Sequence, residues 1–541
     1  MVILAAVLFA WNLWGYDLWA PDEPFFGEGA REMVVDGEWL VPHINGEVNT
    51  HKPPLFFWLI AIFSLPFGEV SSLTARAPSV LAALGTVLLT VRLGRRMGGA
   101  RLGVLAGALT TTTYLFLDKA RSAQIDSLLC FLIAVAVSAF EAFRAGDWPG
   151  RRAGVVFWLA AALAVLAKGP VGLLLPLGIA LATLAFDREL GRWRAFAPFL
   201  GPLVFLAAAG LWVAATILWA DDYSVWGALQ EHFVDRGIHG MHHKQPVWYY
   251  LKVLPYALLP WSFLLPGALI YAWRRRRQGD DRFLLVWGLF VVLFFTVSTE
   301  KRDLYVLPAV PAFALLTARL VGRVTGRWVP ADGAGGEAPG RRWVTVPQGM
   351  VGTLMILAAV AAPIVAPRQG EELVVPAAGL AAVLGAGGLG ILVAAARGRA
   401  WRSVVWTGAT FAAALLVAVS LVFPALNPQK SGRELGVTIR DATAESRARG
   451  RPVLGLDLED VPGVGLGNVP KAVNFYSDGV YLKEVSTAEQ LIAELSVGGP
   501  VFLLANEANL PPLPEEIERR MSVVYSTRLS RKDLVFLRFD G

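Results

Sequence analysis

Acidic and basic side chains gather in one segment of the chain, Trp19 to Pro54. Asp22 and Glu23 follow an apolar run at its start, and Lys52 stands before two prolines at its end. A carboxylate can remove a proton from an acceptor and a lysine can hold a departing phosphate, so these residue types suit transfer from a phosphate leaving group. The simpler interpretation is that Asp22 and Glu23 only cap a helix, because the first turn of a helix favours acids.

Further charged residues stand at the ends of apolar runs. Asp126 opens one run, Lys168 closes another, and Arg236 lies in a loop with four of the six histidines. Asp126 alone could be a capping residue, and the lysines could simply reach from the membrane to its surface. Arg236 alone could belong to a solvated loop. Because charged groups at membrane depth usually pair or line a functional cavity, we predict that these residues share one cavity.

Composition places the chain among multi-pass membrane proteins. Of its 541 residues, 55% are hydrophobic and only 17% are charged, and its mean hydropathy is +0.52. Soluble domains carry about a quarter charged residues. The net charge of +6 does not indicate nucleic acid, because the arginines form short clusters between apolar runs. Cys130, the single cysteine, excludes a disulfide framework and a cysteine-based metal site.

The apolar runs predict a polytopic α-helical protein with about thirteen transmembrane helices, since a spanning helix needs about 20 apolar residues. The predicted spans are about 1–18, 77–93, 102–117, 124–143, 153–167, 170–186, 196–219, 253–273, 283–298, 304–320, 346–366, 373–396 and 402–426. Shorter runs at 25–35 and 54–67 predict helices at the membrane surface. Arginine clusters occupy every second loop, which predicts a cytoplasmic N-terminus. Loops 19–76 and 220–250 then face outward and form the site.

The composition changes after Asn427, where the apolar runs end. Helical patterns at 431–448 and about 487–496 alternate with strand patterns near 452, 500, 522–528 and 533–539. This indicates a soluble α/β domain over 428–541, large enough to fold by itself, after a transmembrane domain over 1–427. The alternation of loops places the C-terminal domain outside. It contains no glycine-rich phosphate loop and no catalytic pair.

Several short motifs give the chain a resemblance to a known family. They are Gly37-x-Trp-Leu-Val-Pro-His-x-Asn-Gly, Lys52-Pro-Pro-Leu-Phe-x-Trp, Arg121-x4-Asp126, Ala167-Lys-Gly-Pro, Glu231-His, Pro246-x-Trp-Tyr-Tyr, Leu259-Pro-Trp and Lys301-x3-Tyr-x-Leu-Pro. Over about the first 320 residues these motifs resemble glycosyltransferases of GT-C type that use lipid-linked sugars. The match is best with the bacterial aminoarabinose transferases of lipid A, which are relatives of the protein O-mannosyltransferases.

The resemblance implies a transferase of the bacterial inner membrane with its active site at the periplasmic face. It implies that the acidic pair Asp22 and Glu23 is catalytic, with Asp22 foremost, and that Asp126 at the fourth span is a further catalytic carboxylate. The residues that would bind the donor phosphate are Lys52, Arg236, Lys168 and Tyr305. The expected partners are a polyprenyl-phosphate sugar donor, a lipid or protein acceptor and membrane lipids.

A divalent metal is a further expectation from the resemblance, and no other cofactor is expected. The lipid A enzymes carry Glu before the Lys-Pro pair, whereas this chain has His51 at that position. Since imidazole also binds such metals, His51 and His232 are the candidate ligands.

The predicted reaction moves one sugar from an undecaprenyl phosphate carrier to an acceptor at the outer face, lipid A or a related envelope glycolipid. An enzyme like the protein O-mannosyltransferases is the alternative within the class. A transporter of lipid-linked sugars is the alternative from another class, because carriers also place charges in membrane cavities. The gathering of charge on one face favours the enzyme, and the sequence shows no inverted repeat of the kind that carriers contain.

Overall fold

The computed structural model describes residues 1–49, 52–196, 199–220, 223–224, 227, 244–327, 339–456, 466, 469–496, 500–529 and 532–540. Contacts divide the chain into two compact units. The first unit holds Met1–Leu13, Thr50–Phe56 and Arg76–Val422, and the second holds Trp14–Asn49, Phe57–Ala75 and Phe423–Gly541.

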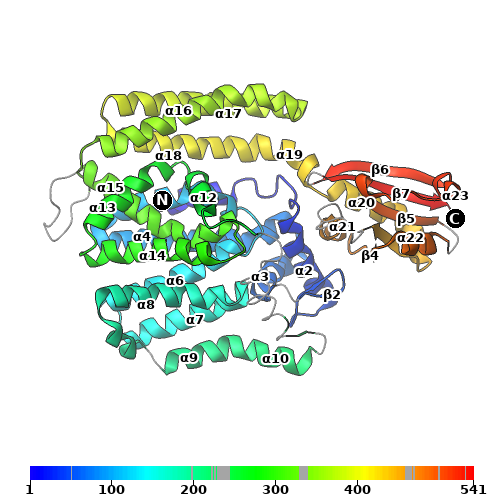
Figure 1. The fold of residues 1–541 in the computed structure, drawn as a ribbon, viewed down its shortest axis with the longest axis horizontal. Coiled ribbons are helices and arrows are strands. Elements are labelled where there is room, and N and C mark those ends of the chain that lie inside the picture. Colours follow the sequence, from blue (N-terminus) through cyan, green and yellow to red (C-terminus); the bar gives the residue numbers. More distant parts are fainter. Residues whose placement is uncertain are drawn as a thin grey trace. The chain divides into compact units, whose positions relative to one another are not determined.

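The first unit is helical (Figure 1). Its α-helices are α1 (Val2–Ala10), α4 (Ser72–Thr111, in this unit from Arg76 onward), α5 (Tyr114–Ala120), α6 (Asp126–Arg144), α7 (Gly150–Lys168), α8 (Val171–Asp187), α9 (Leu200–Phe205), α10 (Leu211–Trp219), α12 (Tyr249–Ala257), α13 (Leu265–Arg274), α14 (Gly279–Val297), α15 (Val310–Val324), α16 (Arg342–Val365), α17 (Val374–Ala396) and α18 (Ala400–Val417). The short segments are η2 (Leu190–Ala195), η3 (Leu206–Gly210), η5 (Ser262–Leu264), η6 (Asp303–Ala309), η7 (Ala366–Arg368), η8 (Glu371–Leu373) and η9 (Ala418–Val422).

Length and composition make this a multi-pass membrane protein. Eight of the described helices are long and apolar enough to cross a membrane, or nine if α12 and α13, bent by 117° at their junction, form one span. Part of the difference from thirteen lies in α4, whose 40 residues cover two predicted spans. At Gly99 the backbone takes a φ of +86°, a left-handed conformation that suits glycine, so α4 consists of two helices joined there. The total of thirteen stays a prediction.

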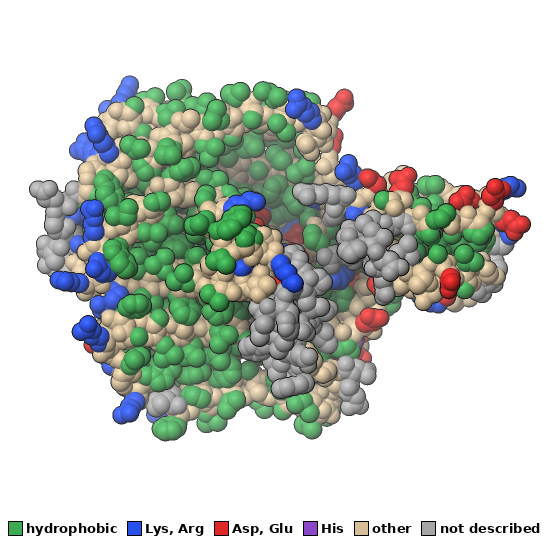
Figure 2. All heavy atoms as spheres, viewed as in Figure 1, with side chains coloured by type: hydrophobic (Ala, Val, Ile, Leu, Met, Phe, Trp, Pro, Cys, Tyr) green, Lys and Arg blue, Asp and Glu red, His purple; other side chains and the backbone are tan. Residues whose placement is uncertain are grey.

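Apolar side chains face outward over much of the helical unit. The helices α16, α17 and α18 pack side by side (Figure 1). In the most apolar stretch of each helix, at most 22% of the residues are buried. Figure 2 shows hydrophobic side chains across the visible face of these helices and Lys and Arg gathered along one end of the unit. An apolar belt that ends in cations is typical of helices in a bilayer.

Two buried arginines fix the end of α1. Arg121 donates from its Nη1 and Nη2 atoms to the carbonyl oxygens of Leu8, Phe9 and Trp11, at 2.8, 3.1 and 2.6 Å. Arg76 donates from Nη1 to the carbonyl of Leu13 at 2.8 Å. The last carbonyls of a helix have no partner within it and favour cations. The arginine of the Arg121-x4-Asp126 motif therefore holds α1 in place.

Ion pairs join several helices at the end of the unit where α6 finishes. Glu141 pairs with Arg144 and with Arg96 of α4. Asp281 of α14 accepts from Arg275 Nε at 3.1 Å and from Arg319 Nη2 at 3.2 Å. Glu141 and Asp281 are fully buried, and such groups persist only when they are paired. This network therefore fixes how α4, α6, α14 and α15 meet.

The second unit combines N-terminal segments with the end of the chain. Its elements are α2 (Asp22–Asp36), β1 (His43–Ile44), β2 (Glu47–Val48), α3 (Leu55–Ser64, in this unit from Phe57), η1 (Leu65–Phe67), α19 (Phe423–Lys430), α20 (Arg433–Ala448), β3 (Val453–Leu456), α21 (Val469–Tyr476), β4 (Leu482–Val485), α22 (Ala488–Leu495), β5 (Pro500–Asn506), η10 (Glu507–Asn509), α23 (Glu515–Glu518), β6 (Met521–Leu529) and β7 (Lys532–Asp540). The predicted transmembrane domain over 1–427 includes all of 19–76, whereas Trp14–Asn49 and Phe57–Ala75 belong to this second unit.

A five-stranded sheet in the order β4-β3-β5-β7-β6 forms the core of the second unit. β3 pairs in parallel with β4 and β5, and β7 runs antiparallel to β5 and β6. Helices α20 and α21 contribute to the core on one face, with Phe502 and Phe536, and α22 contributes on the other, with Leu503. Both faces are covered, which explains why β5 reads as a continuous apolar run.

The helices predicted at 431–448 and 487–496 are confirmed, as are the strands near 452, 500, 522–528 and 533–539. Helices are present at 25–35 and 54–67 as predicted, as α2 and as α3 with η1, and their location at the membrane surface stays a prediction. Sequence reasoning missed α21 and β4. Each is short, with eight and four residues, too few for its pattern to stand out from the neighbouring sequence.

Candidate active site

A cavity of about 810 Å³ in the first unit brings together four of the residues that the sequence singles out. These are Lys52, Asp126, Lys168 and Tyr305. Ser298 and Glu300 line the same cavity. The polar lining therefore contains two ammonium groups, two carboxylates, a phenol and a hydroxyl.

Chain direction explains how Asp126 and Lys168 meet. Asp126 is the first residue of α6 and Lys168 is the last residue of α7. Since these consecutive helices pack against each other and are joined by a short turn, the start of one lies beside the end of the other. Lys168 Nζ forms an ion pair with Asp126 Oδ1. The same ammonium lies 5.0 Å from the ring centre of Tyr305, a cation–π distance.

The rest of the cavity wall is apolar. It is lined by Leu129, Pro170, Val171, Leu174, Phe290, Leu293, Phe294, Phe295, Val297, Leu304 and Pro308. Leu293 and Val297 are 61% and 86% exposed, so the cavity opens toward the exposed apolar surface of α14. Phe295 packs on Tyr305 with ring centres 4.9 Å apart, which joins the apolar wall to the polar end. A ligand with one charged end and a long apolar part fits this lining.

Sequence reasoning missed Glu300 and the aromatic wall. Phe290 and Phe294 stand four residues apart on α14, a spacing that could have shown a helix face. Glu300 belongs to the loop whose motif was recognised through Lys301. In the structure, Lys301 is buried and its Nζ donates to the carbonyl of Gln245 at 3.0 Å. Lys301 therefore holds the backbone of this loop, while Glu300 and Tyr305 face the cavity.

Asp22 and Glu23 belong to the second unit, where their surroundings differ. Glu23 is 5% exposed and its Oε2 accepts a hydrogen bond from the backbone N–H of Trp19 at 2.8 Å. This contact makes Glu23 the residue that fixes the entry to α2. Asp22 is half-buried, and its negative charge attracts the ammonium group of Lys471. Burial lowers the pKa of Lys471, and the charge of Asp22 acts in the opposite direction.

The remainder of α2 organises the hairpin that follows it. Glu32 accepts from the backbone N–H of Asn45 at 2.7 Å, and Glu28 forms a two-bond ion pair with Arg31 at 2.8 Å. Burial, and then the neighbouring Glu28 carboxylate, raise the pKa of Glu32 to about 8. Asn45 and Gly46 both have positive φ, 64° and 71°, so the Asn-Gly pair of the motif is a tight turn.

His51, His232 and Arg236 lie outside the described residues. Within the part of the chain that the structure describes, no group of three or more His, Cys, Asp and Glu side chains is arranged to hold a metal ion. The metal ligands and the phosphate-binding role of Arg236 stay predictions.

The chain has the GT-C membrane fold, which here combines the multi-pass helical unit with the second unit. The structure of ArnT from Cupriavidus metallidurans bound to undecaprenyl phosphate superposes with a TM-score of 0.76 at 19% sequence identity, over 99% of this chain and 97% of that one. ArnT from the same organism in the apo state gives a TM-score of 0.74 at 20% identity. At these identities, the likeness establishes the fold.

The sequence comparisons are more specific. The chain is 32% identical over 333 residues to the undecaprenyl phosphate-alpha-4-amino-4-deoxy-L-arabinose arabinosyl transferase of Edwardsiella ictaluri, and 32% identical over 324 residues to the Pseudomonas aeruginosa protein of the same name. The matches cover 60% and 58% of this chain and 59% and 58% of those relatives. Residues 51–214 match the family model described as dolichyl-phosphate-mannose-protein mannosyltransferase. The resemblance to aminoarabinose transferases is thereby confirmed.

Proposed function

We propose that this protein is a membrane glycosyltransferase that moves a sugar from undecaprenyl phosphate to lipid A or a related glycolipid. The names of the relatives that match about three fifths of the chain support the donor and the sugar class. We further propose that the protein lies in a bacterial inner membrane with the cavity end of α6, and the C-terminus, in the periplasm. The alternation of arginine clusters along the sequence supports that orientation.

The cavity of Lys52, Asp126 and Lys168 is the observation that carries the proposal. A polyprenyl-phosphate sugar has a charged phosphate between a sugar and a long apolar chain. The cavity offers ammonium groups at one end and an apolar wall that opens on the surface of α14. Charge-assisted contacts to a phosphate contribute about 1.5–3 kcal/mol each, and the apolar wall adds burial of the polyprenyl chain.

The reaction needs a base and a group that accepts charge on the leaving phosphate. The acceptor oxygen attacks the anomeric carbon, the bond from that carbon to the phosphate oxygen breaks, and polyprenyl phosphate departs with the bonding electrons. Lys52 and Lys168 would offset the charge that develops on the phosphate. Asp126 would position Lys168 through their ion pair. Asp22 would take the proton of a hydroxyl acceptor, as the resemblance implies.

A protein acceptor is the second candidate, because the family model that matches residues 51–214 is described as a protein mannosyltransferase. The longer matches, over 333 and 324 residues, are to arabinosyl transferases. We therefore place the lipid acceptor first.

One assay separates the two acceptors. The full chain in lipid nanodiscs is given undecaprenyl phosphate carrying aminoarabinose, together with lipid A and a Ser/Thr-rich peptide, and both products are weighed by mass spectrometry. A mass increase on lipid A supports the proposal, and one on the peptide alone supports the protein acceptor. Transfer to neither, with donor bound, would contradict the proposed function. A boiled sample and nanodiscs without the protein serve as controls.

A further inference from the structure

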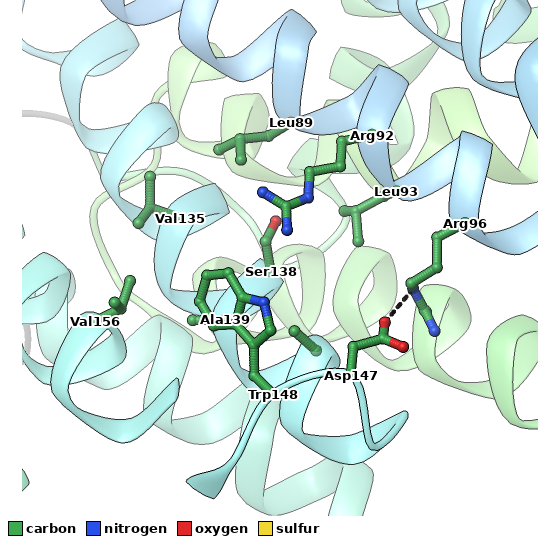
Figure 3. A pocket seen from close by; sticks show the side chains of 11 residues that line it. Leu89, Arg92, Leu93, Arg96, Val135, Ser138, Ala139, Asp147, Trp148 and Val156 are labelled. Carbon is green, nitrogen blue, oxygen red and sulfur yellow. Dashed lines mark ion pairs between the residues drawn. The ribbon is translucent and has the colours of Figure 1, made fainter. Parts of the chain in front are cut away.

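A second cavity, of about 300 Å³, lies between α4, α6 and α7 (Figure 3). Its apolar lining consists of Leu89, Leu93, Val135, Ala139, Ala142 and Val156. Its polar lining consists of Arg92, Arg96, Ser138, Asp147 and Trp148. Like the cavity of Lys52, Asp126 and Lys168, which we call the donor cavity, it therefore combines a charged end with an apolar crevice.

Two arginines lie against the ring of Trp148. The guanidinium carbon of Arg152 is 4.2 Å from its ring centre, and that of Arg92 is 5.4 Å from it. Among the described residues neither arginine forms an ion pair, whereas Arg96 pairs with Glu141 and, at 3.8 Å, with Asp147. The indole thus contacts Arg92, which lines the cavity, and Arg152, which lies against the lining residue Trp148, and the N–H donors of both guanidinium groups are available to an anion.

Ser138 adds a further polar group to the same lining. Its hydroxyl oxygen is buried and has no hydrogen-bond partner within the described part of the chain. Figure 3 shows this hydroxyl pointing toward the side chain of Arg92. A buried hydroxyl without a partner is costly, and a ligand oxygen beside Arg92 would satisfy it.

The cavity lies far from the donor site along the same helices. Asp126 opens α6 and Lys168 ends α7, whereas Trp148 lies in the turn between the end of α6 and the start of α7. With 19 residues in α6 and 1.5 Å per residue, the two ends are roughly 27 Å apart, about the thickness of a hydrocarbon core. The second cavity therefore belongs to the opposite surface of the membrane.

We propose that this cavity binds an anionic glycerophospholipid from the leaflet opposite the donor cavity. Arg92 and Arg152 would hold the headgroup phosphate, Ser138 would donate to an ester or phosphate oxygen, and part of one acyl chain would fill the crevice. Arginines and a tryptophan at the ends of spanning helices are the residues that meet lipid headgroups, and basic pockets between such helices bind anionic lipids. The inference needs the membrane fold and does not depend on the proposed reaction.

Native mass spectrometry of the full chain tests the proposal. The detergent-purified protein is titrated with phosphatidylglycerol, and with phosphatidylcholine as the zwitterionic comparison. Each arginine at a membrane surface contributes about 1 kcal/mol toward an anionic lipid, so Arg92→Gln/Arg152→Gln should lose about thirty-fold in affinity for phosphatidylglycerol. The matched control, Arg95→Gln/Arg151→Gln, removes the same charge from the same two helices, α4 and α7, and within the described residues neither of these guanidinium groups lies over the Trp148 ring. It should bind like the unchanged protein.

A second variant keeps the test valid if the double variant is unstable. Val156→Phe fills the crevice and leaves every arginine in place, and it too should weaken phosphatidylglycerol binding. The melting temperature without lipid shows which variants are folded. Equal losses in the test and control pairs would overturn the proposal, since they would mean general attraction by charge. The same variants are also titrated with undecaprenyl phosphate. If they lose binding of undecaprenyl phosphate and keep that of phosphatidylglycerol, the proposal is overturned in favour of a site for the carrier lipid.

Discussion

Lys52 is the first residue whose role can be measured. It lines the cavity that we propose for the donor, so Lys52→Ala should weaken donor binding by about ten- to a hundred-fold, the value of one charge-assisted contact. Donor affinity is measured by titrating purified protein with a polyprenyl-phosphate sugar. Lys252 offers a matched control, because it is exposed on α12 and does not line the cavity. If Lys52→Ala binds the donor as Lys252→Ala does, Lys52 serves only to anchor its segment at the membrane surface.

Asp22 distinguishes the two kinds of acceptor. An alcohol needs a base in reach, whereas a lipid phosphate, with a second pKa of about 6, is already ionised near neutral pH. With an alcohol acceptor, Asp22→Asn should reduce kcat by about a hundred-fold or more. With a phosphate acceptor the reduction should be much smaller. The measurement is transfer in nanodiscs between pH 6 and 9, and full activity at every pH would remove Asp22 from the mechanism.

Asp126 should behave differently from Asp22, because it contacts Lys168. Asp126→Asn leaves the Lys168 charge without its carboxylate, and that ammonium is then free to hold phosphate. We expect donor or product binding to tighten while kcat falls by about ten-fold, a value within the range for one misplaced charge contact. Separate determination of kcat and KM shows this split. A fall in kcat with weaker donor binding would mean that Asp126 contacts the donor itself.

Glu32 gives the second unit a pH-dependent stability. Its pKa is raised from 4.5 to about 8, so the folded state binds this proton more tightly than the unfolded state. The protonated Glu32 therefore contributes its full share to the stability of the folded state below pH 4.5. This contribution is lost as the pH rises from 4.5 through 8, because the unfolded state ionises first. Glu32→Gln keeps the acceptor for Asn45 and cannot ionise. Its melting temperature should fall less than that of the unchanged protein between pH 5 and 8.5, and identical falls would refute the raised pKa.

At the scale of elements, Arg121 secures the first helix. It gives hydrogen bonds to three carbonyls at the end of α1, and each buried carbonyl left without a donor costs about 1–3 kcal/mol. Arg121→Met should therefore lower the melting temperature of the purified protein by several degrees. Arg151→Met, at an exposed position with the same change of charge, should leave it unchanged. A similar melting temperature in both variants would show that water replaces Arg121 at this helix end.

Helix direction also sets where the chemistry gathers. Asp126 and Lys168 are 42 residues apart in the chain and meet because α6 and α7 are consecutive helices that reverse direction. The same reversal places Trp148 and Arg152 at the opposite end, near Arg92 of α4. One helical hairpin therefore contributes to both cavities, the one lined by Asp126 and Lys168 and the one lined by Trp148.

At the scale of the whole molecule, the second unit joins residues from both ends of the chain. Asp17 accepts hydrogen bonds from Asn427 and Ser431 and pairs with Arg433 at 2.9 Å. Tyr476 accepts from the backbone N–H of Leu18 at 2.7 Å. A C-terminal truncation after 427 should therefore also destabilise the N-terminal segment 14–49, which limited proteolysis of that segment would detect.

Much of this could be predicted from the sequence. Apolar runs and arginine clusters indicated a multi-pass membrane protein, because a bilayer requires long apolar helices whatever their neighbours. Local patterns also indicated α20, α22 and four of the five strands of the sheet. The residue types of the site were evident in Lys52, Asp126 and Lys168, because charged groups at the ends of spans are rare enough to stand out.

Only the tertiary structure decided which of these residues share a cavity and which support the fold. Ion pairs and cavity walls join residues far apart in the chain, and no local pattern records that distance. Lys168 and Lys301 both belong to recognised motifs, yet Lys168 pairs with Asp126 in the cavity and Lys301 holds a backbone carbonyl. Glu23 likewise stands next to Asp22 in the sequence and holds the backbone of Trp19. Identical residue types took different roles because folding gave them different neighbours.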